Sequence, residues 1–151
     1  MKTLLIIYHS QTGHTAQLVE AAYHGACQVP ETHTRMLRAF EATLENLRTC
    51  HGVLFATPEN FGYMSGALKD FFDRTFYPAQ PYRLNLPYAL LISAGNDGTG
   101  AVRQIDRILL GYPMRQVADP VICRGVVTAG HLAQCEELGQ LLATGLACGI
   151  F

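Results

Sequence analysis

Short apolar runs alternate along the chain with longer segments in which apolar residues recur every three or four positions. The runs predict strands, because an apolar stretch without regular polar alternation is typical of a strand buried on both faces of a sheet. The longer segments predict helices with one buried side. The predicted strands are residues 3–8, 32–40, 52–57 and 88–94 and a part of 114–125. The predicted helices are residues 15–27, 41–50, 65–77, 101–110 and 132–146.

Proline residues set several of the expected boundaries. Pro58 is expected to end the strand at 52–57, and Pro120 to break or bend the strand within 114–125. Residues 78–87 contain three prolines and predict a loop. The strand at 32–40 alternates only partly, which predicts a less buried position at an edge of the sheet.

The strict alternation of strands and helices predicts an α/β fold with a parallel sheet and helices on both faces. Parallel strands need long crossovers, and the crossovers here are helical. At 151 residues the chain has the length of one ordinary domain, so a single domain is expected over residues 1–151. In such a fold the ligand lies beyond the carboxyl ends of the strands, near the point where the strand order reverses. The segments that follow the strands are therefore the candidates for a binding site.

Charge and cysteine content exclude several classes of function. The formal net charge is −1 and basic residues do not cluster in either half, which argues against nucleic-acid binding through phosphate neutralisation. The five cysteines are widely spread without a CxxC pair, so they predict neither a disulfide framework nor a zinc site and are typical of a reducing cytoplasm. No apolar run has the length of a membrane helix or the pattern of a signal peptide. We expect a cytoplasmic protein without a membrane span.

The first candidate loop is YHSQTGHT, residues 8–15, between the first strand and the first helix. Amides at a helix start and the hydroxyls of Ser10, Thr12 and Thr15 can donate to an anion. The loop lacks the lysine of an ATP-binding loop, and it has one of the three glycines of a dinucleotide-binding loop. It therefore indicates a single terminal phosphate held by neutral donors, although ordinary helix capping explains the same residues.

Two further loops follow the third and fourth strands and are expected at the same edge of the sheet. TPENFGYMSG, residues 57–66, offers Phe61 and backbone amides to frame a flat polar ring. SAGNDGTG, residues 93–100, offers small residues, Asn96 and Asp97 for the other side of the ring. Each loop alone is typical of an ordinary turn. The three together at neighbouring strand ends indicate a binding site.

These motifs resemble those of the flavodoxin-like superfamily over essentially the whole chain. SQTGHT is similar to the superfamily's [ST]-x-T-G-x-T phosphate loop, and SAGNDGTG resembles the third flavin loop. TPENFGYMSGALKDFFDR resembles the corresponding segment of the NAD(P)H-dependent FMN reductases and the related quinone reductases. The resemblance implies bound FMN and a flavodoxin-like three-layer sandwich, with a five-stranded parallel sheet of order 2-1-3-4-5.

The resemblance also implies which residues hold the cofactor. Those implied to hold the phosphate are Ser10, Gln11, Thr12, Gly13, His14 and Thr15. Those implied to line the isoalloxazine are Pro58, Glu59, Asn60, Phe61 and Gly62 on one side, and Ser93, Ala94, Gly95, Asn96, Asp97 and Gly100 on the other. No catalytic side chain or metal ligand is expected, because the flavin carries the chemistry.

Three functions are compatible with this reading. The first is an FMN-dependent oxidoreductase that takes hydride from NAD(P)H and passes electrons to a quinone or a similar acceptor. The third loop lacks the aromatic residue that stacks on the flavin in many flavodoxins, which leaves that face open to nicotinamide. The second is a flavodoxin-type one-electron carrier, for which a net charge of −1 is a poor match because such carriers are typically strongly acidic.

The third compatible function is that of a non-enzymatic binding module on the same fold, since a fold alone does not fix a function. We favour the oxidoreductase. The choice between NADH and NADPH stays open. So does assembly into a homodimer or a higher homo-oligomer, although the chain lacks the long insertions of the larger, tetrameric quinone reductases.

Overall fold

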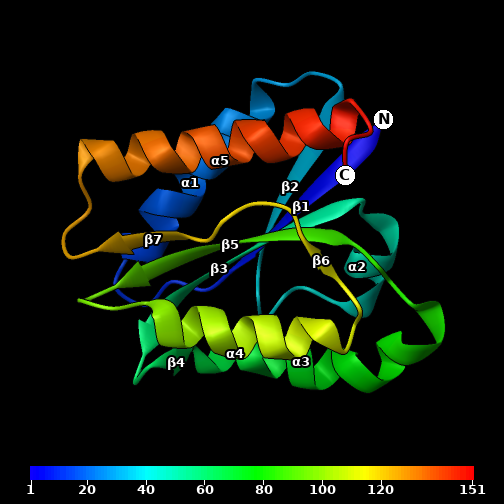
Figure 1. Ribbon diagram of the computed structural model, residues 1–151, viewed down its shortest axis with the longest axis horizontal. Helices are drawn as coiled ribbons and strands as arrows, with labels where there is room; N and C mark the ends of the chain where they lie inside the picture. Colours follow the sequence, from blue (N-terminus) through cyan, green and yellow to red (C-terminus); the bar gives the residue numbers. More distant parts are fainter.

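The computed structural model describes residues 1–151 and contains five α-helices and seven strands (Figure 1). The strands are β1 (Lys2–Tyr8), β2 (Thr32–Arg38), β3 (Gly52–Asn60), β4 (Tyr63–Met64), β5 (Pro87–Ala94), β6 (Arg115–Gln116) and β7 (Val121–Arg124). The helices are α1 (His14–Cys27), α2 (Leu44–Thr49), α3 (Gly66–Ala79), α4 (Thr99–Leu110) and α5 (Ala129–Ala147). A 3₁₀ turn, Gln80–Tyr82, follows α3.

Parallel strands in the order β2-β1-β3-β5 form the main part of the sheet, and both β6 and β7 pair with β5. Because β6 and β7 together fill the fifth position, the predicted order 2-1-3-4-5 is confirmed. Residues 117–120 separate β6 from β7 and include Pro120, in agreement with the expected break. The predicted count of five strands is too low, because two short strands occupy the fifth position and because β4 is an additional strand. β4 pairs antiparallel with the end of β3 and was not predicted.

Helices cover both faces of the sheet. Figure 1 shows α1 and α5 together on one face, and α3 and α4 together on the other. Alternate side chains of β1 reach the two faces: Leu4 and Ile6 pack with α1 and α5, and Leu5 and Ile7 with α2, α3 and α4. All four are almost completely buried. A strand between two apolar layers needs an apolar residue at every position, which explains why residues 3–8 show no polar alternation.

The expected end of the third strand at Pro58 is wrong. β3 continues through Pro58 to Asn60. The carbonyl of Ala56 accepts from the N–H of His9 on the β1 side, and alternate residues of a strand face the same neighbour. The pairing of β1 with β3 stops at Ala56. Pro58 faces the same side as Ala56, where no strand pairs with it, so the N–H that proline lacks is not needed. The proline therefore interrupts no pairing, as at an edge strand.

The expected loop at 78–87 begins too early. α3 continues through Pro78 to Ala79, and the chain then tightens into the 3₁₀ turn at Gln80–Tyr82. Pro78 lies one residue from the end of the helix, where it removes one hydrogen bond of the last turn instead of breaking the middle of the helix.

α1 and α5 pack with their backbones in direct contact. A Cβ atom at Gly25 would lie 1.9 Å from the carbonyl oxygen of Glu136, and a Cβ atom at Gly139 would lie 1.8 Å from that of Ala22. Neither distance leaves room for a side chain. Glycine at both positions thus sets how closely the two helices approach.

Replacing Gly139 with alanine is expected to lower the free energy of unfolding by about 3 kcal/mol, because the added methyl group must push the backbone of α1 away. Urea unfolding followed by circular dichroism measures the change. Gly130→Ala is the matched control in the same helix, since a Cβ atom there meets nothing closer than Thr128 Oγ1 at 3.7 Å. Equal losses in the two variants would contradict the importance of the close contact.

Candidate functional site

The carboxyl ends of β1, β3 and β5 bring the three predicted loops to one edge of the sheet. The parallel register places Tyr8 beside Ala56 and Pro58 beside Ser93. This edge is at the left of Figure 1, where α4 and α5 begin. We call it the rim, and it consists of residues 8–15, 57–62 and 93–100.

The first loop of the rim curls over the start of α1. Ser10 Oγ accepts a hydrogen bond from the N–H of Ala16 at 3.1 Å. Gly13, with φ of 100°, makes the left-handed turn into the helix. The backbone N–H groups of residues 10–15 have no acceptor within the protein. Consecutive free N–H groups at a helix start attract an anion, because they add to the positive end of the helix dipole.

The side chains of the first loop differ in their accessibility. Gln11, Thr12 and His14 are exposed, and Ser10 is half-buried. Thr15, in contrast, is buried with 2% of its surface exposed. An incoming ligand therefore meets the backbone amides together with Gln11, Thr12 and His14 before it meets Thr15.

The second loop is a tight hairpin, whereas an open connection between strand and helix was expected. β3 pairs with β4, and Phe61 and Gly62 alone connect the two strands. Both residues have positive φ, 54° and 70°, as in the two-residue turns whose twist matches that of paired strands. Positive φ is uncommon for a phenylalanine, and Phe61 is fully exposed at the tip. The hairpin therefore presents an aromatic ring at the rim.

Glu59 joins this hairpin to the start of α4. Its Oε1 accepts from the N–H of Gly98 at 2.8 Å, and its Oε2 accepts from the N–H of Ala101 at 3.1 Å. The carboxylate thereby also lies at the positive end of the α4 dipole. A Cβ atom at Gly100 would lie 2.2 Å from the carbonyl oxygen of Gly62, so the hairpin tip touches the backbone of α4. Glu59 and Gly100, both predicted above to line a flavin ring, hold the hairpin against α4.

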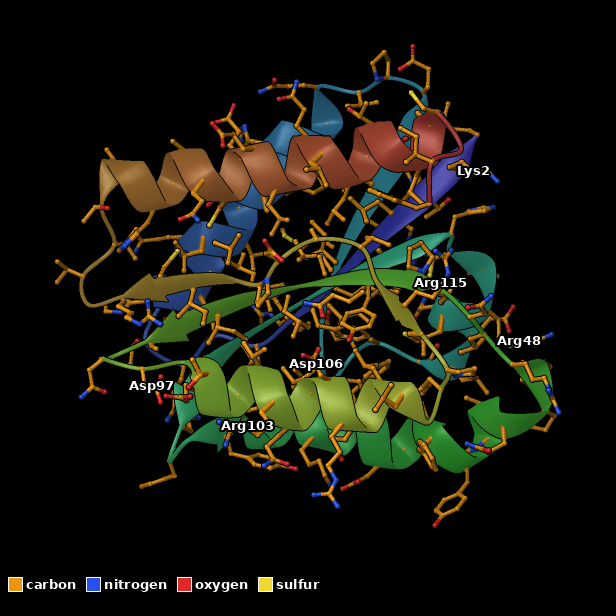
Figure 2. The ribbon with its side chains drawn as sticks, in the orientation of Figure 1. Lys2, Arg48, Asp97, Arg103, Asp106 and Arg115 are labelled. Atoms are coloured by element: carbon orange, nitrogen blue, oxygen red, sulfur yellow. The ribbon has the colours of Figure 1, made fainter.

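Asp97 organises the third loop. Its Oδ1 accepts from the hydroxyl of Thr99 at 2.7 Å and from the N–H of Thr99 at 3.3 Å. The hydrogen bond from the Thr99 hydroxyl lowers the pKa of Asp97, so this carboxyl group is ionised near neutral pH. Arg124 Nε donates to the backbone carbonyl of Asp97 at 2.7 Å. Figure 2 shows Asp97 at this end of α4, with Arg103 further along the helix.

The structure places the remaining predicted residues at the same rim. Pro58 and Asn60 are half-buried at the end of β3. Ser93 and Ala94 end β5, and Gly95 and Asn96 are exposed beyond it.

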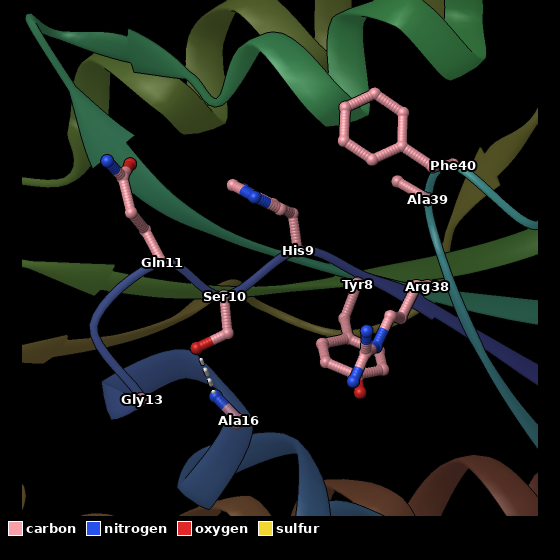
Figure 3. Close-up of a pocket in the computed structure, with 9 residues that line it drawn as sticks. All are labelled: Tyr8, His9, Ser10, Gln11, Gly13, Ala16, Arg38, Ala39 and Phe40. Atoms are coloured by element: carbon pink, nitrogen blue, oxygen red, sulfur yellow. Dashed lines mark hydrogen bonds between the residues drawn. The ribbon is translucent and has the colours of Figure 1, made fainter.

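A cavity of about 420 Å³ opens beside the first loop, on the side of β2 (Figure 3). The predicted loop contributes Ser10, Gln11 and Gly13 to its lining. The ends of β1 and β2 contribute Tyr8, His9, Arg38, Ala39 and Phe40, which are not among the predicted site residues.

His9 and Phe40 form the less polar part of this cavity. Their rings meet edge to face, with centroids 6.2 Å apart, and Phe40 is 67% exposed. His9 Nδ1 is buried without a hydrogen-bond partner. Burial lowers the pKa of the imidazole, so His9 is neutral near pH 7.

Sequence reasoning restricted to the loops after the first, third and fourth strands misses these cavity residues. The strand order 2-1-3-4-5 implied by the resemblance could have identified them, because it places the second strand directly beside the first. The observed register pairs Tyr8 with Arg38. Residues 38–40 therefore reach the same edge as residues 8–10.

The sequence model of the NADPH-dependent FMN reductase family matches residues 5–125 of the chain. The chain belongs to this family. The matched segment includes all three loops of the rim. Membership agrees with the predicted FMN cofactor and NAD(P)H donor, and it confirms the resemblance drawn from the motifs.

Named relatives match part of the chain. An NAD(P)H dehydrogenase (quinone) of Acidithiobacillus ferrooxidans is 35% identical over 95 residues, which cover 50% of this chain and 48% of the relative. A flavodoxin of Aquifex aeolicus is 34% identical over 73 residues, which cover 48% of this chain and 40% of the relative. The chain thus spans about half the length of these relatives or less.

The fold is that of a flavodoxin. The structure of an archaeal flavodoxin superposes with a TM-score of 0.84 at 19% identity, covering 95% of this chain and 98% of that one. The predicted flavodoxin-like fold is therefore confirmed. None of the helices combines the length and the apolar character needed to cross a bilayer.

Replacing Glu59 with glutamine is expected to lower the free energy of unfolding by about 1–2 kcal/mol. Glutamine keeps one acceptor oxygen where the carboxylate has two, and it loses the charge at the start of α4. Hydrogen exchange should accelerate at the amides of Gly98 and Ala101. Glu20→Gln, at an exposed position of α1, is the control and should change stability by less than about 0.5 kcal/mol. Unchanged exchange at both amides would show that the link is dispensable.

Proposed function

We propose that the protein binds FMN at the rim and uses it to transfer electrons from NAD(P)H to a quinone or a similar acceptor. The observation that carries the proposal is the run of unpaired N–H groups at residues 10–15, which lies at the same edge as the hairpin and the third loop. Family membership and the relative named NAD(P)H dehydrogenase (quinone) support it.

The first loop would hold the phosphate of FMN. A phosphate monoester carries close to two negative charges at pH 7 and accepts several hydrogen bonds at once. The free amides from Ser10 to Thr15 supply donors from one side, and the exposed hydroxyl of Thr12 can add another. Gly13 makes the left-handed turn that lets the loop close around a compact anion.

The other two loops would hold the flat ring. The hairpin tip carries Phe61, and the third loop presents Gly95 and Asn96 without an aromatic residue. Glu59 fixes the spacing between the two loops, because its carboxylate bonds to the start of α4. One side of the ring would thus meet an aromatic residue, and the side without one would stay open to a second flat molecule such as nicotinamide.

Bound FMN supplies the redox chemistry, since its ring accepts hydride and passes electrons on. The protein's part is to bind, orient and limit access. The hydrogen bonds of Glu59 and Asp97 hold both loops in place before any ligand arrives. Preformed loops bind a ring without a further ordering cost.

A one-electron carrier is the second candidate, because one of the relatives is named a flavodoxin. The net charge of −1 argues against it, since a carrier that meets basic partners gains from a strongly acidic surface. Arg103 and Arg107 on α4, close to the third loop, make this surface still less acidic.

Titration of the purified protein with FMN tests the proposal. We expect a yellow complex that binds FMN at least about tenfold more tightly than riboflavin, because charge-assisted hydrogen bonds to the phosphate are lost with riboflavin. Quenching of flavin fluorescence measures both affinities. A protein that binds neither flavin would refute the reductase and the carrier together.

Anaerobic mixing of the FMN complex with NADPH or NADH separates the two candidates. Rapid loss of the yellow absorbance with either nucleotide is the result expected of a reductase. An FMN complex that keeps its colour with both nucleotides, yet is reduced by light, would instead identify a carrier.

A further inference from the structure

Arg38 is a cation beside the first loop that has no partner in the protein. It is the last residue of β2, it is exposed, and it lines the cavity next to Ser10 and Gly13. It takes part in none of the ion pairs or side-chain hydrogen bonds of the structure. The cationic groups of Arg74 and Arg124 are, in contrast, already bound to other groups.

The pleat of β2 directs Arg38 to the face on which α1 lies. Alternate residues of a strand share a face, and Thr32 of the same set donates its hydroxyl proton to the carbonyl of Ala143 in α5 at 2.8 Å. The register also places Arg38 opposite Tyr8, which packs against the cluster of α1 and α5. Figure 3 shows the Arg38 guanidinium alongside the Tyr8 ring, on the side of β1 where Ser10 and Ala16 lie.

An anion at the first loop would therefore have amides on one side and a full positive charge on the other. Free amides and the helix dipole supply the equivalent of roughly half a charge, whereas a phosphate monoester carries close to two. The lining contains no other lysine or arginine, and no carboxylate competes for Arg38 there. A guanidinium also presents a planar pair of donors that matches two phosphate oxygens.

We propose that Arg38 is the cationic part of a phosphate-monoester site whose other wall is the loop of residues 10–15. The inference rests on the proposed function and makes it more specific. Two molecules of that function carry a phosphate monoester: FMN has one at its ribityl end, and NADPH has one on its adenosine ribose, which NADH lacks. The charge missing from the first loop in the sequence is thus supplied by the neighbouring strand.

The affinities of FMN and riboflavin for the Arg38→Ala variant test whether Arg38 binds the phosphate of FMN. If Arg38 binds the FMN phosphate, FMN affinity should fall about tenfold, and riboflavin affinity should stay unchanged because riboflavin has no phosphate. Raising the salt concentration should weaken FMN binding more in the wild-type protein than in the variant, since salt screens the charge that the variant lacks.

The Michaelis constants of the FMN-loaded enzyme test whether Arg38 binds the phosphate of NADPH. If Arg38 instead binds the phosphate of NADPH, Arg38→Ala should raise the KM for NADPH about tenfold and leave that for NADH unchanged. FMN affinity would then equal that of the wild type. The loss of FMN affinity supports the inference. A change confined to NADPH would overturn it, because in the FMN-loaded enzyme the loop of residues 10–15 already holds a phosphate and Arg38 would then serve a separate site.

Arg35→Ala is the matched control, because it removes the same charge from the same strand. Arg35 pairs with Leu5, so it lies on the opposite face from Arg38, and it does not line the cavity. Arg38→Gln, which keeps most of the side-chain length, serves as the second variant if alanine disturbs the end of β2. Both Arg38 variants should retain the wild-type circular dichroism spectrum, and the control should behave as wild type in every measurement.

An unchanged ratio of FMN to riboflavin affinity in both Arg38 variants would overturn the inference, whatever happens to the constants for NADPH and NADH. The proposed function would survive that outcome, because the wild-type protein would still bind FMN. A wild-type protein that binds no flavin would instead overturn the proposed function, and the inference with it.

Discussion

Parallel pairing of β1 with β3 and of β3 with β5 determines where the three loops of the rim lie. The shared register ends the three strands at nearly the same level, and each is followed by a segment that returns as a helix. Free amides, a hairpin and a glycine-rich turn therefore meet at one edge. Glu59 then fixes the position of the hairpin relative to α4, because its carboxylate bridges from the end of β3 to the start of α4.

The two halves of the rim differ in the groups that they leave free. The half formed by residues 10–15 offers unpaired N–H groups and lies beside Arg38. The half next to α4 contains the carboxylates of Glu59 and Asp97, whose hydrogen bonds are already made within the protein. An elongated ligand with one anionic end and one neutral ring can satisfy both halves in a single orientation. FMN has that shape and charge distribution.

Local sequence patterns were sufficient for the alternation of strands and helices and for the position of the loop of residues 10–15, whereas the strand order followed from the resemblance of the motifs. Residues 3–8 show no polar alternation because both faces of β1 are covered. The motif of the first loop occupies six consecutive residues, Ser10 to Thr15, so it is visible in the sequence. The hairpin after Pro58 was not predictable in this way, since the proline is tolerated only because β1 has ended beside it. The partners of Glu59 lie about forty residues away. Arg38 and Ser10 line the same cavity only because β2 pairs with β1. Contacts of that kind follow from the assembled sheet and from no local pattern.

The glycine contact between α1 and α5 has a consequence for how such a sequence can change over evolutionary time. Gly25 and Gly139 are constrained by the carbonyl groups of the facing helix and by nothing at the rim. A descendant of this chain that abandoned its ligand would be free to change the loop of residues 10–15. It would still have to keep both glycines, or alter both helices together. These two positions should therefore trace the ancestry of the fold in proteins where the binding motif has already disappeared.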